Sequence, residues 1–242
     1  MKYVIEFSKT GRCAYISHLD LARALLRALR MTGLRPAYSQ GFNPHPKMSI
    51  ALPLSLGQSS VCELIEIEIG EGQTGANAAN ALNDRLPDGI RVLSVREKPA
   101  AYPKPLASYV KAAEYEILCD GIFDANERLA AFFECKQVLI QKTSKKTGQT
   151  VEKDIRPDML SYTVKKELKG WLLCRVTLRA EGGAVLSPRT FFDAFVRNCH
   201  SRTDCHSGAD CHSREGGNLY VPSITRTAIL GDGGAVLSGT PR

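Results

Sequence analysis

The residues best suited to chemistry lie in one short run, Tyr38–Lys47 (YSQGFNPHPK). It contains His45, whose imidazole ordinarily titrates near neutral pH and suits proton transfer. Prolines on both sides of His45 restrict the backbone, so the loop loses little conformational entropy when it binds a ligand. We expect a binding or catalytic loop. The alternative is a structural turn in which the histidine only forms hydrogen bonds.

The other side chains of this run suit an unpaired nucleotide. Tyr38 and Phe42 offer aromatic faces for stacking, and Gln40 and Asn43 offer amide hydrogen bonds. The ammonium group of Lys47 can pair with a phosphate. Aromatic, amide and cationic groups together are typical of sites that bind single-stranded RNA.

An arginine stripe precedes the run. Arg23, Arg27 and Arg30 are spaced four and three residues apart, which places them on one face of a predicted helix. The apolar residues predicted to form its core face are Ala22, Leu25, Leu26 and Leu29. The arginine face is either an ordinary solvated surface or a contact for a nucleic-acid backbone.

The same helix begins with a histidine. Ser17 is the predicted N-cap, and Asp20 follows three residues later as in a capping box. His18 in the first turn is more typical of a packing or capping group, because a cation is disfavoured at a helix N-terminus. If the loop folds over this terminus, His18 and His45 converge beside unpaired backbone N–H groups, which form an anion site.

A second basic element is the predicted hairpin 142–156, with Gly148 near its tip. Its cations include Lys145, Lys146 and Arg156, which suit a clamp on RNA. A solvated turn has the same composition, so both interpretations stay open.

The elements that position these residues alternate in a familiar order. The first half is predicted to form, in turn, a strand at 2–8, a helix at 17–33, strands at 37–54 (interrupted by the loop 41–47) and 62–69, a helix at 75–86 and a strand at 90–95. Strand, helix, strand, strand, helix and strand is the split βαβ, or ferredoxin-like, arrangement.

The second half repeats that order. Its predicted elements are a strand at 115–119, a helix at 124–134, strands at 138–142, 160–166 and 171–178, a helix at 187–196 and a strand at 221–230. We therefore predict an α+β protein of two tandem ferredoxin-like units with antiparallel sheets, at residues 1–97 and 113–230. Residues 98–112 contain the proline-rich stretch KPAAYPKP and are predicted to be a linker.

Two segments depart from this pattern. Residues 199–218 are a low-complexity insertion in which Cys-His-Ser recurs three times. Cysteine and histidine are zinc ligands, but the uniform spacing of six matches no zinc-site pattern, and apolar residues that could organise a site are absent. The ending CHSREGGN resembles a translated intergenic repeat, so we favour an inert surface loop and predict no metal site. The tail 231–242 is expected to be disordered.

Composition sets broad limits. The net charge is +7, and residues 1–50 carry eight Lys or Arg against two acidic residues, which suggests an anionic partner or simply a solubilising surface. No apolar run approaches the about 20 residues of a membrane helix, and the N-terminus lacks signal-peptide features, so we expect a cytoplasmic location without a membrane partner.

The scattered cysteines are expected to be reduced and buried. Phosphate-loop, dinucleotide-binding and iron–sulfur cysteine motifs are absent, and we expect no cofactor on this chain.

Four stretches have a distinctive sequence: residues 15–57, which include SQGFNPHPK, the strand CELIEIEI, and the later segments DIRP and TRTAIL. They closely resemble the radical-SAM-linked family of unknown function. In that family the domain is encoded beside, or fused to, a cobalamin-binding-type radical SAM protein. The resemblance implies association with such an enzyme and brings no catalytic assignment. The Cys-His repeat departs from the family pattern.

Three functions remain open on these grounds. The first is an accessory module that binds RNA or another phosphate-bearing substrate and presents it to a radical SAM partner. The second is a metal-independent endoribonuclease that uses His45 and His18. The third is a protein–protein adaptor whose loop contacts the radical SAM enzyme directly.

Overall fold

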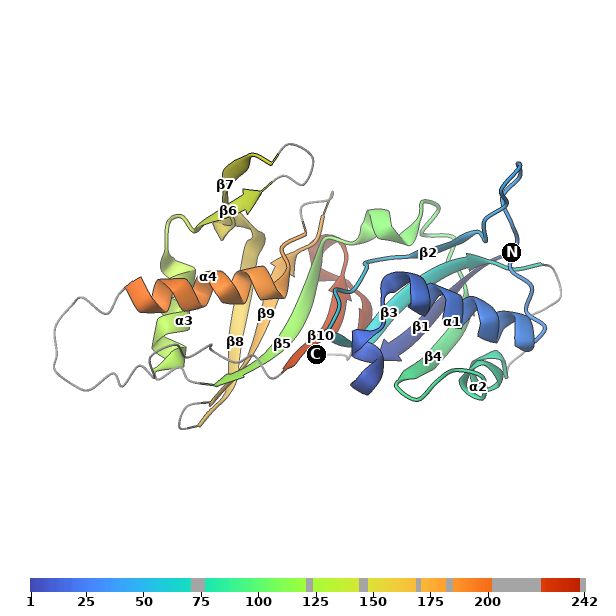
Figure 1. The fold of residues 1–242 in the computed structure, drawn as a ribbon, viewed down its shortest axis with the longest axis horizontal. Helices are drawn as coiled ribbons and strands as arrows, with labels where there is room; N and C mark the ends of the chain where they lie inside the picture. The colour runs from blue at the N-terminus through green and yellow to red at the C-terminus, as the bar shows by residue number, and fades with distance from the viewer. Residues whose placement is uncertain are drawn as a thin grey trace. The chain divides into compact units, whose positions relative to one another are not determined.

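The computed structural model describes residues 1–70, 77–120, 124–143, 148–168, 171–181, 185–201 and 223–239. It has an α+β fold in which most strand pairs are antiparallel (Figure 1). Two compact units are present. The first comprises Met1–Glu114, Ala180–Gly183 and Thr225–Arg242, and the second comprises Tyr115–Arg179 and Ala184–Ile224.

The first unit contains the loop Tyr38–Lys47 and the helix that carries the arginine stripe. Its elements are β1 (Lys2–Lys9), η1 (Gly11–Tyr15), α1 (His18–Met31), β2 (Met48–Ile50), β3 (Ser59–Glu68), α2 (Ala78–Asn83), β4 (Ile90–Glu97), η2 (Leu106–Tyr109), β10 (Ser223–Leu230), η4 (Asp232–Gly234) and β11 (Val236–Gly239). β1 pairs with β3 and β4, and β2 pairs with β3, all antiparallel. The predicted alternation of strands and helices in this half is confirmed.

The core of this unit lies between the sheet and its two helices (Figure 1). Phe7 of β1 and Ile67 of β3 are fully buried and pack in one cluster with Leu25 of α1 and Leu82 of α2. The two-residue period of the strands and the three-to-four-residue period of α1 place these side chains on the faces that meet in this core.

α1 forms as its sequence predicts. The Ser17 hydroxyl accepts a hydrogen bond from the Asp20 amide at 3.1 Å, which satisfies one of the free N–H groups at the helix start. The helix ends at Met31, and Gly33 then adopts a φ of +79°, a conformation that favours glycine.

The segment predicted as a free linker is instead fixed to the first unit. Lys98 forms a 2.8 Å ion pair with the buried Glu66, and the other carboxylate oxygen of Glu66 accepts from the Leu106 amide at 3.0 Å. The rings of Tyr102 and Tyr109 make an edge-to-face contact with centroids 5.0 Å apart. This segment has partners for its polar groups, which a flexible linker lacks.

The closing strand belongs to the first unit rather than to the second, where it was expected. β10 pairs in parallel with the start of β3, with Thr225 opposite Ser59. Its Arg226 forms a buried 2.8 Å ion pair with Glu63 of β3, which ties the strand to this unit.

The tail also differs from the prediction, because it is ordered as far as Gly239. β11 pairs with β10, and the Ser238 hydroxyl donates a 2.6 Å hydrogen bond to Glu6 of β1. Paired backbone groups and a side-chain anchor replace the expected disorder. Residues 240–242 lie outside the described part of the chain.

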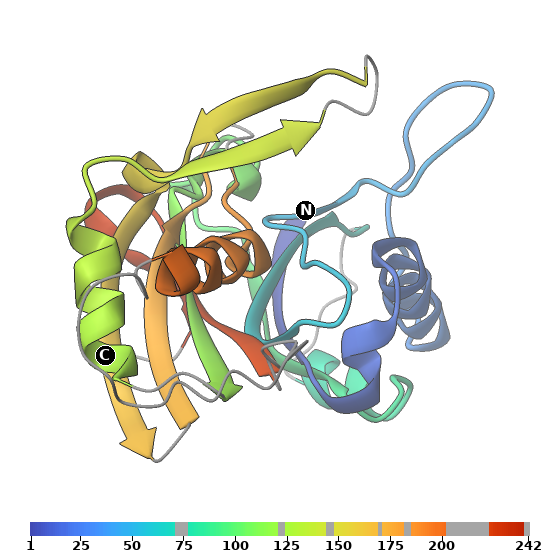
Figure 2. The same cartoon turned by 60° about the vertical axis from the view of Figure 1, so that its left-hand side comes forward.

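The second unit combines a sheet, a separate hairpin and two helices. Its elements are β5 (Ala112–Asp120, in this unit from Tyr115), α3 (Ala125–Glu134), β6 (Leu139–Thr143), β7 (Thr150–Asp154), η3 (Arg156–Asp158), β8 (Met159–Leu168), β9 (Trp171–Arg179) and α4 (Pro188–Ser201). The strand order is β5-β9-β8, while β6 and β7 form a two-stranded sheet of their own, visible as a twisted ribbon in Figure 2. Phe132 of α3 packs against Phe191 and Phe195 of α4, with ring centroids 5.8 and 5.5 Å apart.

No helix in the described ranges combines the length and apolar character that a membrane span requires.

Candidate functional site

An open groove of about 670 Å³ lies in the first unit between α1 and the loop that follows it. In Figure 2 this light-blue loop projects beyond α1. The groove is lined by Arg23, Leu26, Arg27, Arg30 and Met31 of α1 and by Tyr38, Pro44, His45 and Pro46 of the loop. We call the first set the helix wall and the second set the loop wall. The structure thus brings the arginine stripe and the proline-flanked histidine together.

The helix wall carries positive charge that is only partly neutralised. Arg23 pairs with Asp20 at 3.0 Å, and both side chains are largely exposed. Hydrogen bonds from Ser17 and Arg23 hold the pKa of Asp20 below its usual range, so this carboxylate stays ionised beside Arg23. Among the described residues, no carboxylate lies within 4 Å of the guanidinium groups of Arg27 or Arg30. These two cations are therefore available to an anionic ligand.

The loop wall is held by backbone hydrogen bonds at its base. The Ser39 amide donates to the His45 carbonyl at 2.8 Å, and the His45 amide donates to the Ser39 hydroxyl at 2.9 Å. The backbones of Tyr38 and Pro46 also pair in an isolated antiparallel β-bridge. The backbone of His45 is thus fixed, while its side chain is exposed and lines the groove.

Tyr38 joins the two walls. Its hydroxyl accepts a hydrogen bond from Arg30, and the Arg30 guanidinium lies 5.9 Å from the centroid of the tyrosine ring. A guanidinium at this distance is attracted by the electron-rich ring. Tyr38 remains 36% exposed, so part of its ring is open to a ligand.

The apolar part of the helix wall was not predicted. Leu26 and Met31 lie among the arginines, and Met31 is 51% exposed although it is a large apolar side chain. Sequence analysis placed Leu26 in the core face and did not assign Met31. The signal was available, because both residues fall at three- and four-residue steps from the arginines and therefore share their face.

Four predicted residues of the loop do not line the groove. Gln40, Phe42 and Asn43 are exposed farther out along the loop, and Phe42 is fully exposed. Gly41 has a φ of +125°, so the turn at this point needs a glycine. Lys47 does not reach the groove either, since its ammonium group pairs with Glu68 at 3.2 Å.

The expected convergence of His18 and His45 is not found. His18 is exposed at the start of α1 and does not line the groove, which extends along the later turns of the helix. The reason is the anchoring of the loop to β3. The Ala37 amide donates to the Glu68 carbonyl at 2.8 Å, and the Glu68 amide donates to the Lys47 carbonyl at 3.0 Å.

Of the three cations named for the second basic element, Arg156 lies within the described residues and has a structural role. Arg156 donates to the Met159 carbonyl at 3.0 Å, and its guanidinium lies 5.8 Å from the centroid of the Phe133 ring. Lys145 and Lys146 lie outside the described residues. Arg156 belongs to the second unit and is not among the described residues that line the groove.

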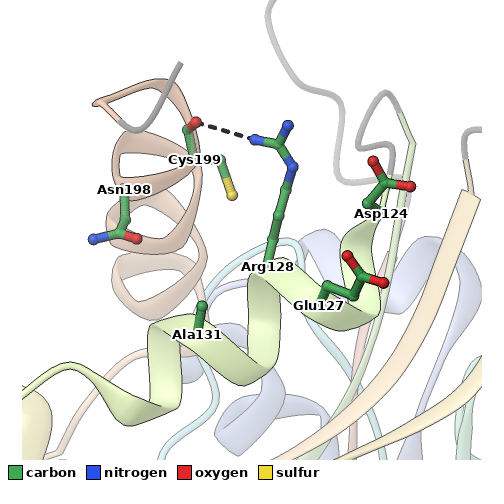
Figure 3. Close-up of a pocket in the computed structure, with 6 residues that line it drawn as sticks. All are labelled: Asp124, Glu127, Arg128, Ala131, Asn198 and Cys199. Atoms are coloured by element: carbon green, nitrogen blue, oxygen red, sulfur yellow. Dashed lines mark hydrogen bonds between the residues drawn. The ribbon is translucent and has the colours of Figure 1, made fainter. Parts of the chain in front are cut away.

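A smaller pocket in the second unit lies between α3 and α4 (Figure 3). Arg128 donates to the Cys199 carbonyl at 3.1 Å, and Asp124 and Glu127 lie on the other side of the arginine. Cys199, the first residue of the predicted insertion, is part of α4, while residues 202–218 lie outside the described residues. The described chain contains no group of three or more His, Cys, Asp or Glu side chains that could hold a metal ion.

Cys62 and Cys174 are buried and are poor nucleophiles. Burial raises the pKa of Cys62 and the pKa of Cys174 to about 12, which keeps both thiols protonated at neutral pH. Both are free thiols in the interiors of the sheets, as expected for cysteines that act as small apolar residues.

Comparison with known proteins gives one informative match. The model of a family described as "Uncharacterized protein conserved in bacteria (DUF2344)" matches residues 2–188. No curated protein matches the sequence.

Two solved structures share low similarity with this chain. One, "Crystal Structure of a Cbf5-Nop10-Gar1 Complex", is 11% identical with a TM-score of 0.49, covering 94% of this chain and 48% of that chain. This chain therefore spans less than half the length of that matched chain. The other, "Crystal structure of putative glycine cleavage system transcriptional repressor", is 12% identical with a TM-score of 0.27, covering 83% of this chain and 91% of that chain.

Proposed function

We propose that this chain, which belongs to the bacterial family DUF2344, is a cytoplasmic accessory module of a radical SAM system. In this proposal the groove between the helix wall and the loop wall binds RNA or another phosphate-bearing substrate. The module then presents that substrate to the partner enzyme.

The main support for this proposal is a pair of arginines that no carboxylate neutralises in the described structure. Arg27 and Arg30 lie on the helix wall, opposite a loop wall that contains Tyr38 and His45. Arginine suits phosphate recognition because its planar fork donates two parallel hydrogen bonds to oxygen atoms. A tyrosine ring and a histidine on the facing wall supply stacking and hydrogen bonding for the rest of a nucleotide.

The radical SAM partner is supported by sequence alone. The run SQGFNPHPK is the most specific part of the resemblance to proteins encoded beside such enzymes. In the structure this run forms the exposed loop, a position from which it can contact a second protein.

We also propose the finer fold assignment of tandem ferredoxin-like units. In the first unit the strand order β4-β1-β3-β2 supports it, since all three pairs are antiparallel. In the second unit the supporting order is β5, α3, β8, β9 and α4, with the β6–β7 hairpin inserted after α3. The fold assignment by itself carries no argument for function.

The test is RNA binding at several salt concentrations. Fluorescence anisotropy of a labelled single-stranded oligoribonucleotide is measured with the wild type and with Arg27→Ala/Arg30→Ala. Each phosphate contact on a single strand contributes about 0.7 to the slope of log K against log salt, so the variant is expected to lose at least about this much slope. The matched control is Arg85→Ala/Arg91→Ala, two exposed arginines of the same unit outside the groove. Equal loss in both variants contradicts a groove site.

A second candidate function, the protein–protein adaptor, is favoured by Phe42. This large apolar side chain is fully exposed in a loop whose base is braced by hydrogen bonds between Ser39 and His45. Aromatic side chains in such positions are typical anchors of protein interfaces. Co-purification with the neighbouring radical SAM protein in the absence of RNA, lost in Phe42→Ser and kept in Arg27→Ala/Arg30→Ala, supports the adaptor over the RNA-binding module.

The endoribonuclease alternative stays a prediction. Its two proposed catalytic histidines do not both line the groove. His45 lines the groove and His18 does not. RNA cleavage in the presence of EDTA, abolished by both His45→Ala and His18→Ala, is the result that favours it.

A further inference from the structure

The two walls of the groove differ in chemistry, and this difference assigns an orientation to the ligand. We infer that the groove takes one unpaired nucleotide at a time, with its phosphate on the helix wall and its base against the loop wall. This inference rests on the proposed function and names the ligand and its orientation.

The helix wall provides for one phosphate. Arg27 and Arg30 are three residues apart, which corresponds to about 4.5 Å along the helix axis. Side chains as long as arginine converge easily over that distance, so both guanidinium groups reach the same phosphate. Arg23 adds little, because its charge is paired with Asp20 at 3.0 Å.

The loop wall provides for a base. Tyr38, Pro44 and Pro46 line this wall and carry rings that can stack with the flat face of a nucleobase, and His45 can hydrogen bond to its edge. Leu26 and Met31 supply apolar contact from the opposite side of the groove. Among the described residues, none of those that line the groove carries a carboxylate that would repel the phosphate.

The size of the groove and the contact between its two walls favour a single unpaired nucleotide over a duplex. Its volume of about 670 Å³ falls within the range of about 300–1,000 Å³ that is typical of sites for small ligands. The hydrogen bond from Arg30 to Tyr38 joins the two walls, so a double helix cannot pass between them at that point. In a duplex the base faces are also covered by stacking and cannot meet Tyr38.

The experiment separates the base from the phosphate. Binding of a single-stranded oligoribonucleotide is compared with binding of an oligomer of equal length that lacks bases, and of a duplex. We expect the wild type to bind the abasic oligomer about 5- to 150-fold more weakly, the range that one stacked base contributes. Tyr38→Leu is expected to reduce binding of the normal oligomer by a factor in the same range. It should leave the salt slope and the binding of the abasic oligomer unchanged.

Two variants control for structural damage. Tyr38→Phe keeps the ring but loses the hydroxyl that bonds to Arg30, and it should retain most of the affinity. Tyr15→Leu removes a tyrosine that is 72% exposed and does not line the groove, and it should bind like the wild type.

The outcomes distinguish this inference from the proposed function. If normal and abasic oligomers bind equally, with a salt slope that depends on Arg27 and Arg30, the inference fails and the proposed function stands. Duplex RNA or an acidic peptide that competes as well as the single strand overturns the inference in the same way. If the single strand does not bind, or binds with an affinity that does not depend on salt, the inference and the proposed function both fail.

Discussion

A buried ion pair joins Arg226 of β10 to Glu63 of β3, and its removal has a calculable effect. The two side chains are 2% and 1% exposed and lie 2.8 Å apart. The guanidinium also donates to the carbonyls of Leu52 and Pro53, at 2.8 and 3.2 Å. In Arg226→Met these three acceptors lose their donor, and the Glu63 carboxylate is left buried without its main counter-charge.

The expected cost is large. Breaking a buried pair by removing one partner costs about 3–5 kcal/mol in the free energy of unfolding. For a chain of this size each kcal/mol lowers the melting temperature by about 2–4 °C, so Arg226→Met should melt about 6–20 °C below the wild type. Far-UV circular dichroism during urea and thermal unfolding measures both quantities.

Two further variants test whether the loss of stability comes from the unpaired charge of Glu63. Glu63→Leu/Arg226→Met removes both charges, and it should recover most of the lost stability because apolar replacement of a buried pair is often neutral. Arg12→Met changes an exposed arginine of the same unit and should shift stability by less than about 0.5 kcal/mol. A loss below about 1 kcal/mol in Arg226→Met, or a double variant no more stable than the single one, refutes the reasoning.

Three other predictions concern single contacts. Ser17→Ala removes a hydrogen bond that lowers the pKa of Asp20, so carboxyl NMR should show this pKa rising toward its usual value. The wild type loses stability as the pH falls through the folded-state pKa of Asp20, and the variant should lose less stability over the same pH range. Lys98→Met removes the ion pair with Glu66 and should speed amide hydrogen exchange in residues 98–106, whereas unchanged exchange would show that this contact does not hold the segment. Cys62 and Cys174 should resist alkylation at about pH 8 until urea unfolds the protein, because burial raises the pKa of each to about 12, and rapid labelling of the folded protein would contradict this.

The parts of the fold that depend on local signals could be predicted from the sequence. α1 follows from its cap at Ser17, its apolar spacing and the glycine at position 33. The arginine stripe on its surface follows from the same helical period. β3 follows from the apolar alternation of CELIEIEI.

The parts that depend on distant partners could not be predicted in this way. The segment 98–106 is fixed by Glu66, and β10 is fixed by Glu63, more than 160 residues earlier in the chain. Proline content and position along the chain gave no sign of these contacts. The glutamates within the apolar strand CELIEIEI were a hint, because a carboxylate that becomes buried in a sheet needs a cationic or N–H partner.

The same distinction between local signals and distant contacts applies to the candidate site. Sequence reasoning selected His45, Tyr38 and the arginine stripe, since their residue types and spacing are visible in the chain. The place where the loop meets the helix is set by its hydrogen bonds to Glu68 of β3, which is why His45 lies along the later turns of α1 and not beside His18. No local pattern encodes that register.

We expect a phosphate-bearing ligand to occupy the groove between the helix wall and the loop wall. The most direct measurement is an NMR titration of the isotope-labelled protein with a single-stranded oligoribonucleotide, following arginine Nε–H and histidine ring signals. We expect saturable shifts at Arg27, Arg30 and His45, with His18 and Arg156 unchanged. Shifts that appear at Arg156 while the signals of Arg27, Arg30 and His45 stay constant would contradict the account.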